Sequence, residues 1–186
     1  MRRKRAIRAA KLGQLEMVKF LLERGAKLAA RDHVGFTALH EAAVVEFLLN
    51  RGMAVDVRCD LGGTPLCSTA NECFTNETCY VAVAKVLLAH GADVNARGRD
   101  HQTPLHRAAD WGHPQIMQTL LAAGADPGVR DDDGQTALDI ANSADDPRLL
   151  ADVAAGRKAC AKSLRGARPI QPAPASTNLP AGELKP

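Results

Sequence analysis

Residues 103–130 read TPLHRAADWGHPQIMQTLLAAGADPGVR, and they contain the signals for two helices and the turn between them. Thr103 can cap a helix and Pro104 fits its first turn, so a short helix is predicted to begin there. Gly112 allows a tight turn, and an apolar run at helical spacing follows it. Gly124 is predicted to end this second helix. The stretch therefore specifies a pair of short helices and then a polar connector that is rich in Asp and Gly.

The same frame recurs along the chain. The glycine that ends one unit precedes the threonine that opens the next by twelve residues in four places: Gly25 to Thr37, Gly52 to Thr64, Gly91 to Thr103 and Gly124 to Thr136. The stretch from each threonine to the next glycine varies, with lengths of 15, 27 and 21 residues. The last belongs to a regular 33-residue unit, the first is six residues short and the second six long. A fixed connector beside a helical half of variable length indicates an internal repeat.

The composition suits such a repeat. Hydrophobic residues make up 46% of the chain but aromatic residues only 3%, so the core is expected to consist of Leu, Val and Ala. Small side chains suit thin, closely stacked helices. Two short helices cannot bury an apolar face alone, so stacking on neighbouring units is expected to supply the core.

Several segments resemble the ankyrin repeat. The clearest are 103–109 and 91–96, and weaker copies are 37–43 and 64–70. Residues 136–141 resemble the start of a terminal repeat, and 15–22 resemble the second helix of a first repeat. The resemblance covers about residues 5–150.

The resemblance implies an all-α solenoid of about five repeats, with the first and last incomplete. Helix pairs stack, and hairpin fingers project at right angles to them. The expected repeats are about 4–36, 37–63, 64–102, 103–135 and 136–156. A last helix is expected over 149–155 and is predicted to end at Gly156. Residues 157–186 are then expected to form a basic and Pro-rich disordered tail.

The centre of the array is irregular. Repeat two is six residues shorter than the regular unit in its helical half. It is predicted to form one bent or continuous helix over 39–49, or a poorly packed turn. Six extra residues within 71–80 are predicted to lengthen a loop or to add a turn to the helices. Cys73 and Cys79 lie there, and they are interpreted as reduced thiols rather than as a disulfide or a metal site. The glycosylation sequon at Asn76 is interpreted as incidental.

Two histidines lie in the repeated Thr-x-Leu-His pattern, His40 and His106. A metal or catalytic role is one interpretation, but the resemblance favours a bond from one repeat to the next. Cys67 takes this place in the third repeat, so that tie is expected to be weaker. His101 stands where the family usually has Gly, at a position that tends to need a positive φ, which leaves the shape of that finger open.

The resemblance places partner-binding residues at the finger tips and near the end of the first helix in the fourth repeat. They are His33, Val34, Phe36, Asp60, Leu61, Arg99, Asp100, Gln102, Asp110, Trp111, Asp132, Asp133 and Gln135. Trp111 is the only Trp, and it is either an exposed anchor for a partner or a residue packed on a neighbour. The same alternatives hold for Phe36.

The leading function is therefore a protein-binding scaffold or adaptor with an unidentified protein partner and no cofactor. An enzyme is disfavoured because no Gly-rich phosphate loop, paired carboxylates, zinc motif or nucleophile elbow is visible. A substrate-recruiting subunit of a larger complex, such as a ubiquitin ligase, would need a docking box in the C-terminal tail, and none is recognised.

Other partners are disfavoured too. A net charge of +3 and a pI near 8.7 argue little for nucleic acid, despite the two basic ends. No apolar stretch approaches the ~20 residues that span a bilayer, and nothing in the sequence points to a small-molecule substrate. The basic start at 1–5 is either a nuclear import signal or a solvated helix start. Five cysteines and no recognised secretory signal favour the cytoplasm or the nucleus.

Overall fold

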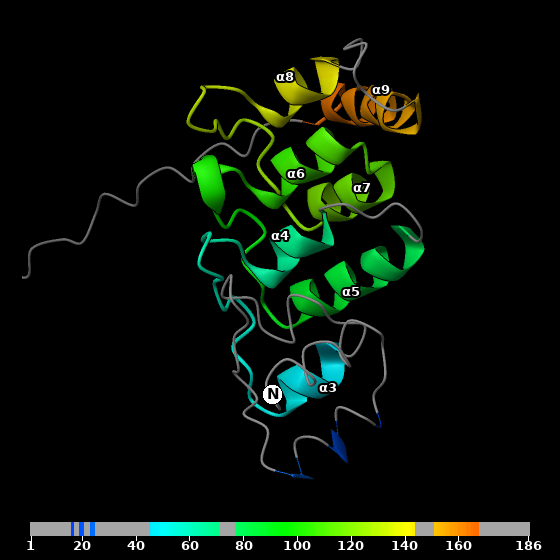
Figure 1. Cartoon of the computed structure of the whole chain (residues 1–186). Coiled ribbons are helices and arrows are strands. Elements are labelled where there is room, and N and C mark those ends of the chain that lie inside the picture. Colours follow the sequence, from blue (N-terminus) through cyan, green and yellow to red (C-terminus); the bar gives the residue numbers. More distant parts are fainter. Residues whose placement is uncertain are drawn as a thin grey trace, which may run out of the picture.

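A computed structural model describes residues 45–70, 77–143 and 151–167, together with Glu16, Lys19, Phe20, Glu23 and Arg24 (Figure 1). For residues 77–79 it describes the backbone only. The helices are α3 (Val45–Asn50), α4 (Pro65–Thr69), α5 (Glu77–Ala89), α6 (Pro104–Trp111), α7 (Pro114–Ala122), α8 (Ala137–Asn142) and α9 (Ala151–Arg165), with a 3₁₀ turn η1 (Arg99–His101). No strand occurs in these parts of the chain.

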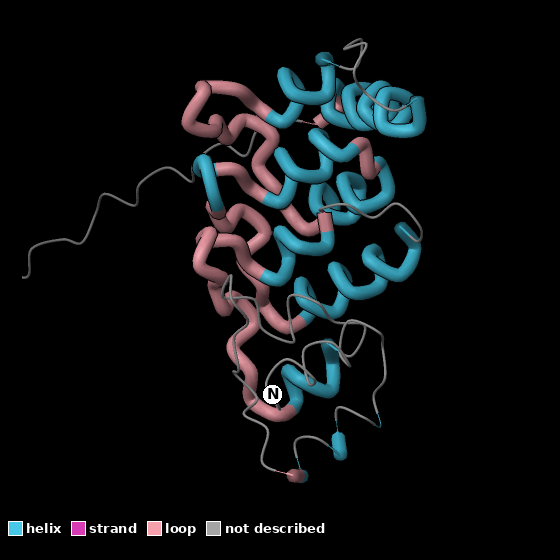
Figure 2. The backbone as a smooth tube through the Cα atoms, in the orientation of Figure 1, coloured by secondary structure: helices cyan, strands magenta, loops and turns pink. Residues whose placement is uncertain are grey.

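The helices stand in two columns (Figures 1 and 2). Helices α4, α6 and α8 form an inner column, and α3, α5, α7 and α9 form an outer one. Each inner helix packs on the outer helix of its own unit, and neighbouring helices also pack within each column. The connectors project as fingers beyond the inner column (Figure 2). This arrangement confirms the predicted all-α solenoid.

Helix α6 shows why the frame folds in this way. Thr103 caps it in an extended conformation, and Pro104 occupies the first turn. The Thr103 amide donates to Nδ1 of His106 at 3.2 Å, which satisfies a backbone donor that the helix leaves unpaired. The helix ends at Gly112, which has a left-handed φ of 68°. The same capping threonine opens α4 at Thr64 and α8 at Thr136.

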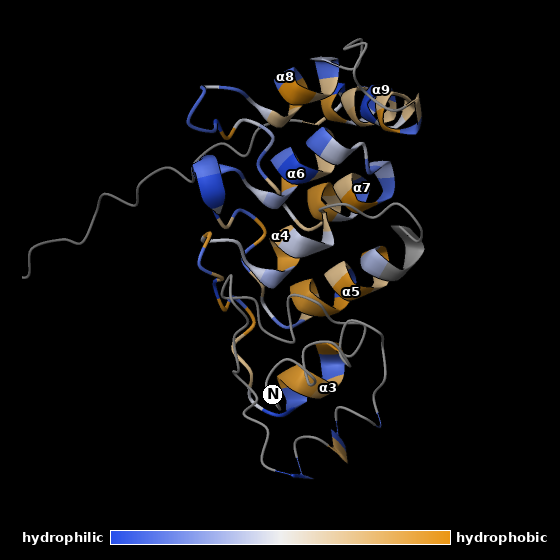
Figure 3. Ribbon diagram, viewed as in Figure 1, coloured by the Kyte–Doolittle hydropathy of each residue, from blue (hydrophilic) through white to orange (hydrophobic). Residues whose placement is uncertain are grey.

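The core is a continuous row of small and medium side chains between the two columns. Its fully buried members include Leu66, Leu87, Leu105, Ile116, Met117 and Leu120. Ala108 and Ala109 are also fully buried, which lets neighbouring helices approach closely. Figure 3 shows the contrast between the largely hydrophobic α3 and α5 and the hydrophilic tip at η1. Burial of each large apolar side chain contributes about 1.5–3 kcal/mol.

The insertion in repeat three lengthens the outer helix. Helices α5 and α7 end at the same distance before their glycines, Gly91 and Gly124, but α5 has 13 residues and α7 has 9. The extra residues therefore add about one turn at the start of α5, which was one of the two alternatives. Residues 71–76 lie outside the described part of the chain. The predicted bent helix at 39–49 stays a prediction, because only its last part, in α3, is described.

The predicted domain end at residue 156 is wrong. Helix α9 continues through Gly156 to Arg165 and buries Arg157, Cys160 and Leu164. Gly156 is needed for close packing rather than for ending a helix, because a Cβ there would lie 2.0 Å from the carbonyl oxygen of Gly112. Residues 157–165 therefore belong to the folded array. The predicted disordered tail from 168 onward lies outside the described residues.

Candidate functional site

The constant connector folds into the same hairpin in each described finger. The amide of Cys59 donates to Gly63 O at 3.0 Å, that of Gly98 to Gln102 O at 2.9 Å, and that of Asp131 to Gln135 O at 3.0 Å. Each donor precedes the capping threonine by five residues and each acceptor precedes it by one. The constant spacing in the sequence therefore corresponds to a constant backbone geometry.

Neighbouring fingers are bonded to one another. The amide of Asp132 donates to Asp100 O at 3.1 Å, near the tips. Nearer the helices, Asp93 N donates to Asp56 Oδ2 at 3.0 Å, and Asp126 N donates to Asn95 Oδ1 at 2.9 Å. Because these bonds connect one unit to the next, the fingers form a continuous row rather than independent loops.

The predicted binding residues of the fingers lie along this row, which we call the finger row. Its exposed members are Asp60, Leu61, Arg99, Asp100, Asp132, Asp133 and Gln135. Leu61 is the exposed apolar residue of the row, with 48% of its surface accessible. Gln102 is half-buried. His33, Val34 and Phe36 lie outside the described residues.

The third finger differs from its neighbours at its tip. Gly62 and Gly134 have φ values of 76° and 73°, and His101 occupies the same position with a φ of 53°. The expected positive φ is thereby confirmed. Asp100 also has a positive φ, 56°. The left-handed conformation costs roughly 1–2 kcal/mol in a residue with a side chain. A bond of 2.6 Å between His101 Nδ1 and Asp132 Oδ1 helps to hold this tip against the next finger.

His106 ties α6 of the fourth unit to Gln135, the residue directly before the capping threonine of the fifth unit. Its Nδ1 accepts from the Thr103 amide at 3.2 Å, so Nε2 carries the proton and donates to Gln135 O at 3.1 Å. Burial lowers the pKa of His106 below its ordinary value of 6.5, which keeps the ring neutral in this role. The interpretation of this histidine as a tie between repeats is confirmed. His40 lies outside the described residues.

Cys67 occupies the equivalent place in the third unit and makes a weaker tie, as expected. Its Sγ lies 3.9 Å from Ala96 O, and a thiol is a weak donor. Burial raises the pKa of the Cys67 thiol, so the group stays protonated. Cys59, Cys67 and Cys160 are buried free thiols. Cys73 and the side chain of Cys79 lie outside the described residues.

Asp110 is held by an ion pair within the fold, and its role in binding a partner stays a prediction. Arg157 of α9 donates from Nη2 to Asp110 Oδ1 at 2.5 Å and from Nε to Asp110 O at 2.8 Å. The arginine is 8% exposed, so this ion pair fastens α9 to the end of α6. Trp111, the next residue, is half-buried rather than fully exposed. The sequence does not predict this ion pair, because the last helix is expected to end at Gly156, before Arg157.

A set of arginines on the fingers is not among the residues predicted from the sequence. Arg58, Arg97 and Arg130 each precede the capping threonine by six residues. Nη1 of Arg58 donates to Gly62 O at 2.9 Å and to Arg97 O at 2.6 Å, and Nη1 of Arg130 donates to Gly134 O at 2.5 Å. The constant twelve-residue connector contains this signal, because the same residue type recurs at the same offset.

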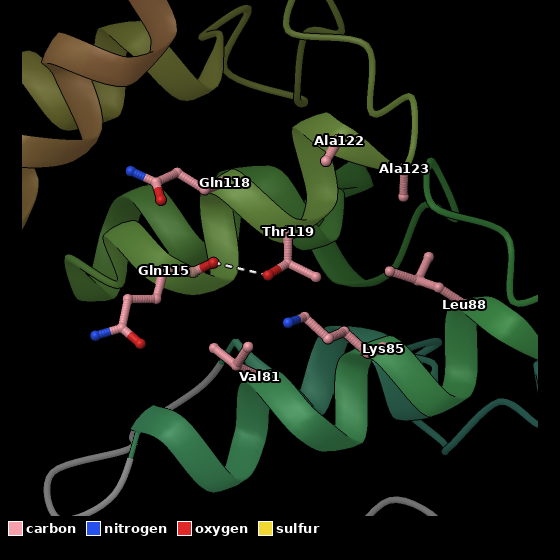
Figure 4. A pocket seen from close by; sticks show the side chains of 8 residues that line it. All are labelled: Val81, Lys85, Leu88, Gln115, Gln118, Thr119, Ala122 and Ala123. Atoms are coloured by element: carbon pink, nitrogen blue, oxygen red, sulfur yellow. Dashed lines mark hydrogen bonds between the residues drawn. The ribbon is translucent and has the colours of Figure 1, made fainter.

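The outer column carries a shallow open hollow between α5 and α7 (Figure 4). Its lining consists of Val81, Lys85, Leu88, Gln115, Gln118, Thr119, Ala122 and Ala123. Only one of these side chains is charged. Elsewhere in the described residues, no group of His, Cys, Asp and Glu is arranged to hold a metal ion. No described helix is long and apolar enough to span a bilayer.

Comparisons with known proteins agree with this geometry. Two family models described as ankyrin repeats (many copies) match residues 6–44 and 87–141, which together are about half of the chain. The chain is also similar to the protein fem-1 homolog C of Danio rerio, with 58% identity over 36 residues. That match covers 19% of this chain and 6% of the relative.

Proposed function

The chain belongs to the ankyrin repeat family, and on that basis we propose that it binds a partner protein in its concave groove. The groove is the surface bounded by the finger row and by the inner helices α4, α6 and α8. Ankyrin repeats generally mediate protein–protein interaction. The chain acts in this proposal as a scaffold or adaptor rather than as an enzyme.

The observation that carries the proposal is a constant frame with variable tips. Three successive fingers share one backbone hydrogen bond at nearly one length, 2.9–3.0 Å. Their exposed tips nevertheless differ at equivalent positions. Three residues before the capping threonine, Leu61 stands where the next fingers have Asp100 and Asp133. Four residues before it, Arg99 stands where the other fingers have Asp60 and Asp132. A rigid row that displays different side chains offers a preorganised surface, and preorganisation lowers the entropic cost of binding.

A finer form of the proposal is recruitment of a substrate to a larger complex, such as a ubiquitin ligase. The similarity to fem-1 homolog C covers only 6% of that protein, so it supports the repeat and not a whole activity. The finer form requires two partners at once, one in the groove and one elsewhere. We further propose a location in the cytoplasm or the nucleus, which fluorescence microscopy of a tagged full chain would test.

An affinity capture followed by crosslinking tests the groove. The full chain is compared with Leu61→Ser/Asp133→Ala, with Asp132→Ala/Asp133→Ala and with Trp111→Ala. A matched control, Gln115→Ala/Gln118→Ala, alters the outer hollow instead. We expect at least one crosslinked protein to be retained by the control and lost from Leu61→Ser/Asp133→Ala. Retention of every captured protein by all groove variants would contradict the proposal, as would equal losses from the control.

A further inference from the structure

The third finger has a different turn from its neighbours. In the second and fourth fingers the turn is closed by the amide of a glycine, Gly62 or Gly134, which donates to the carbonyl three residues earlier at 2.9 and 3.1 Å. In the third finger the amide of Gln102 donates to Arg99 O at 3.1 Å. The bond that closes this turn therefore lies one residue further along the repeat, and η1 stands at the tip (Figure 2).

Two consecutive residues at this tip have a positive φ. Asp100 has a φ of 56° and a ψ of 28°, and His101 has a φ of 53°. Such a pair is typical of a type I′ turn, which favours glycine because a side chain costs free energy in this conformation. Among the described residues, only these two combine a side chain with a positive φ. Backbone strain of this kind is concentrated where proteins bind ligands or switch conformation. The strain therefore points to a use for the side chain of His101.

The fold has room for a side chain at the position of His101 but does not need one for packing. The equivalent residues of the neighbouring fingers are Gly62 and Gly134. A Cβ on Gly134 would meet no atom within 4 Å, and one on Gly62 would meet nothing closer than 3.7 Å. The imidazole of His101 is likewise exposed, with 59% of its side-chain surface accessible. It therefore adds to the surface of the finger row rather than to the core.

Asp132 of the fourth finger fixes the direction of the imidazole. Nδ1 of His101 lies 2.6 Å from Asp132 Oδ1. An ionised carboxylate only accepts hydrogen bonds, so Nδ1 carries the proton and Nε2 of the neutral ring is an acceptor. Nε2 has no partner among the described residues. A carboxylate on one ring nitrogen makes the other more basic, as in histidines that bind metal ions, so Nε2 is a strengthened acceptor that faces solvent.

The contact between the two fingers does not depend on this imidazole. The backbone also joins them, because the amide of Asp132 donates to Asp100 O at 3.1 Å. A glycine at position 101 would keep that bond and would adopt the positive φ without strain. The side chains of His101 and Asp132 are both 59% exposed, so the bond between them contributes little to stability. A role in holding the fingers together therefore does not account for the strain.

We propose that His101 is a specificity-determining residue of the groove, and that its Nε2 accepts a hydrogen bond from a lysine or arginine side chain of the partner protein. The proposal rests on the proposed function, because it assigns one contact within the same groove. The neutral imidazole and Asp132 together have one negative charge, which favours a cationic donor over a neutral one. Arg99 does not compensate this charge, since its Nε lies 3.6 Å from the carboxylate of Asp100.

Selection of peptides on the full chain tests this assignment. A random peptide library displayed on phage is selected on the immobilised chain at about pH 8, where an ordinary histidine is neutral. Enriched peptides are synthesised with a fluorescent label, and fluorescence anisotropy measures their affinities for the unaltered chain and for each variant.

Two variants and one control isolate the imidazole. His101→Asn removes it but keeps a residue that tolerates a positive φ. His101→Gly gives the third finger the residue that its neighbours have at this position. The matched control is His90→Asn, which makes the same change at an exposed histidine directly after α5, outside the groove.

We expect the enriched peptides to be rich in Lys and Arg and to depend on His101. Both variants should weaken binding about ten-fold, the effect of losing one hydrogen bond to a charged group, and the control less than about two-fold. Binding to the unaltered chain should also weaken between about pH 8 and about pH 5.5, because a protonated ring has no acceptor. His101→Asn should lose this pH dependence.

Thermal unfolding distinguishes a binding role of His101 from a structural one. The midpoint of His101→Gly should equal or exceed that of the unaltered chain, because glycine relieves the strain at the tip. A lower midpoint together with weaker binding would mean that His101 acts by holding the fingers, and it would overturn the assignment. Enriched peptides without Lys or Arg, a preference for acidic peptides, or equal affinities for the unaltered chain and His101→Asn would overturn it too.

The groove variant Leu61→Ser/Asp133→Ala separates this inference from the proposed function. Peptides that this variant releases and His101→Asn keeps would contradict the role of His101 while supporting groove binding. If neither variant releases any enriched peptide, groove binding itself fails. A selection that enriches no peptide would count against both.

Discussion

The junction between the third and fourth units and the junction between the fourth and fifth share one backbone frame but differ in one side chain. At the later junction His106 donates to Gln135 O at 3.1 Å, whereas at the earlier one the Cys67 sulfur lies 3.9 Å from Ala96 O. The repeat frame therefore sets the geometry of each junction, while the residue at one position sets how firmly two units are joined. The groove is therefore expected to be held most firmly at its C-terminal end.

The largest loss of stability is expected from a substitution that breaks the stronger junction, between α6 and the finger before α8. His106→Ala removes the buried ring and leaves the Thr103 amide without its partner, while Gln135 O keeps the bond from the Asp131 amide. The unpaired amide costs about 1–3 kcal/mol and the lost packing of the ring adds to it, so we expect the free energy of unfolding to fall by about 3 kcal/mol. Urea denaturation at neutral pH measures it. Cys67→Ala is the matched comparison and should cost about 1 kcal/mol. Equal losses would remove the distinction between the junctions.

The next largest loss of stability is expected where α9 packs against the C-terminal end of α6. A Cβ at residue 156 would lie 2.0 Å from Gly112 O, so Gly156→Ala must displace α9 from the turn after α6. We expect a loss of about 2 kcal/mol, the usual cost of overpacking a tight contact. Gly166→Ala is the control, because a Cβ there meets nothing closer than Ser163 O at 3.7 Å. Identical unfolding midpoints for the two variants would show that Gly156 and Gly112 are not in close contact.

The pH dependence of stability distinguishes the two junctions as well. The pKa of His106 is lowered in the folded chain, so the unfolded chain takes up a proton first as the pH falls below about 6.5. Its contribution is thus complete above about pH 6.5 and is lost below it, by at most about 1.4 kcal/mol per pH unit. The pKa of Cys67 is raised, so its contribution is complete below about pH 9 and falls above it.

Urea midpoints measured across the pH range check both losses of stability, the one below about pH 6.5 (the acid limb) and the one above about pH 9 (the alkaline limb). His106→Gln should lose the acid limb while keeping the alkaline one, and Cys67→Ala should do the reverse. An acid limb that is unchanged in His106→Gln would assign the effect to another group.

The smallest change in stability is expected from a substitution that strengthens the weaker junction. Cys67→His places the ring of the fourth unit in the third, where Gln102 O has the same place as Gln135 O. One added hydrogen bond should raise stability by about 0.5–1 kcal/mol, seen as a higher urea midpoint. A loss of stability would mean that the surroundings of Cys67, which is 6% exposed, cannot admit a ring.

The sequence predicted what depends on short-range rules. The capping threonine and the turn at Gly112 follow from local chemistry and are observed. The positive φ at His101 follows from the resemblance, because the family usually has Gly at that place. The tie made by His106 was predicted from a resemblance whose motif includes that histidine. These features recur within each unit, so one unit is enough to reveal them.

Features that depend on contacts between distant residues were not predicted. The sequence predicts that a helix ends at Gly156, but the packing of Gly156 against Gly112 is visible only in the structure. The pairing of Arg157 with Asp110 likewise joins residues 47 positions apart. The constant offset of Arg58, Arg97 and Arg130 is detectable in the sequence, but the bonds of Arg58 and Arg130 to finger carbonyls are visible only in the structure.

Hydrogen exchange of the full chain measures how firmly the two junctions are held. Peptide segments that cover the third and fourth fingers, together with α6 and α8, should exchange more slowly than the segment that covers α4 and the finger before it, residues 55–70. The expected order follows from the stronger tie at His106, because opening of a firmly joined unit is rarer. Equal exchange in the two regions, or faster exchange around His106, would contradict the account.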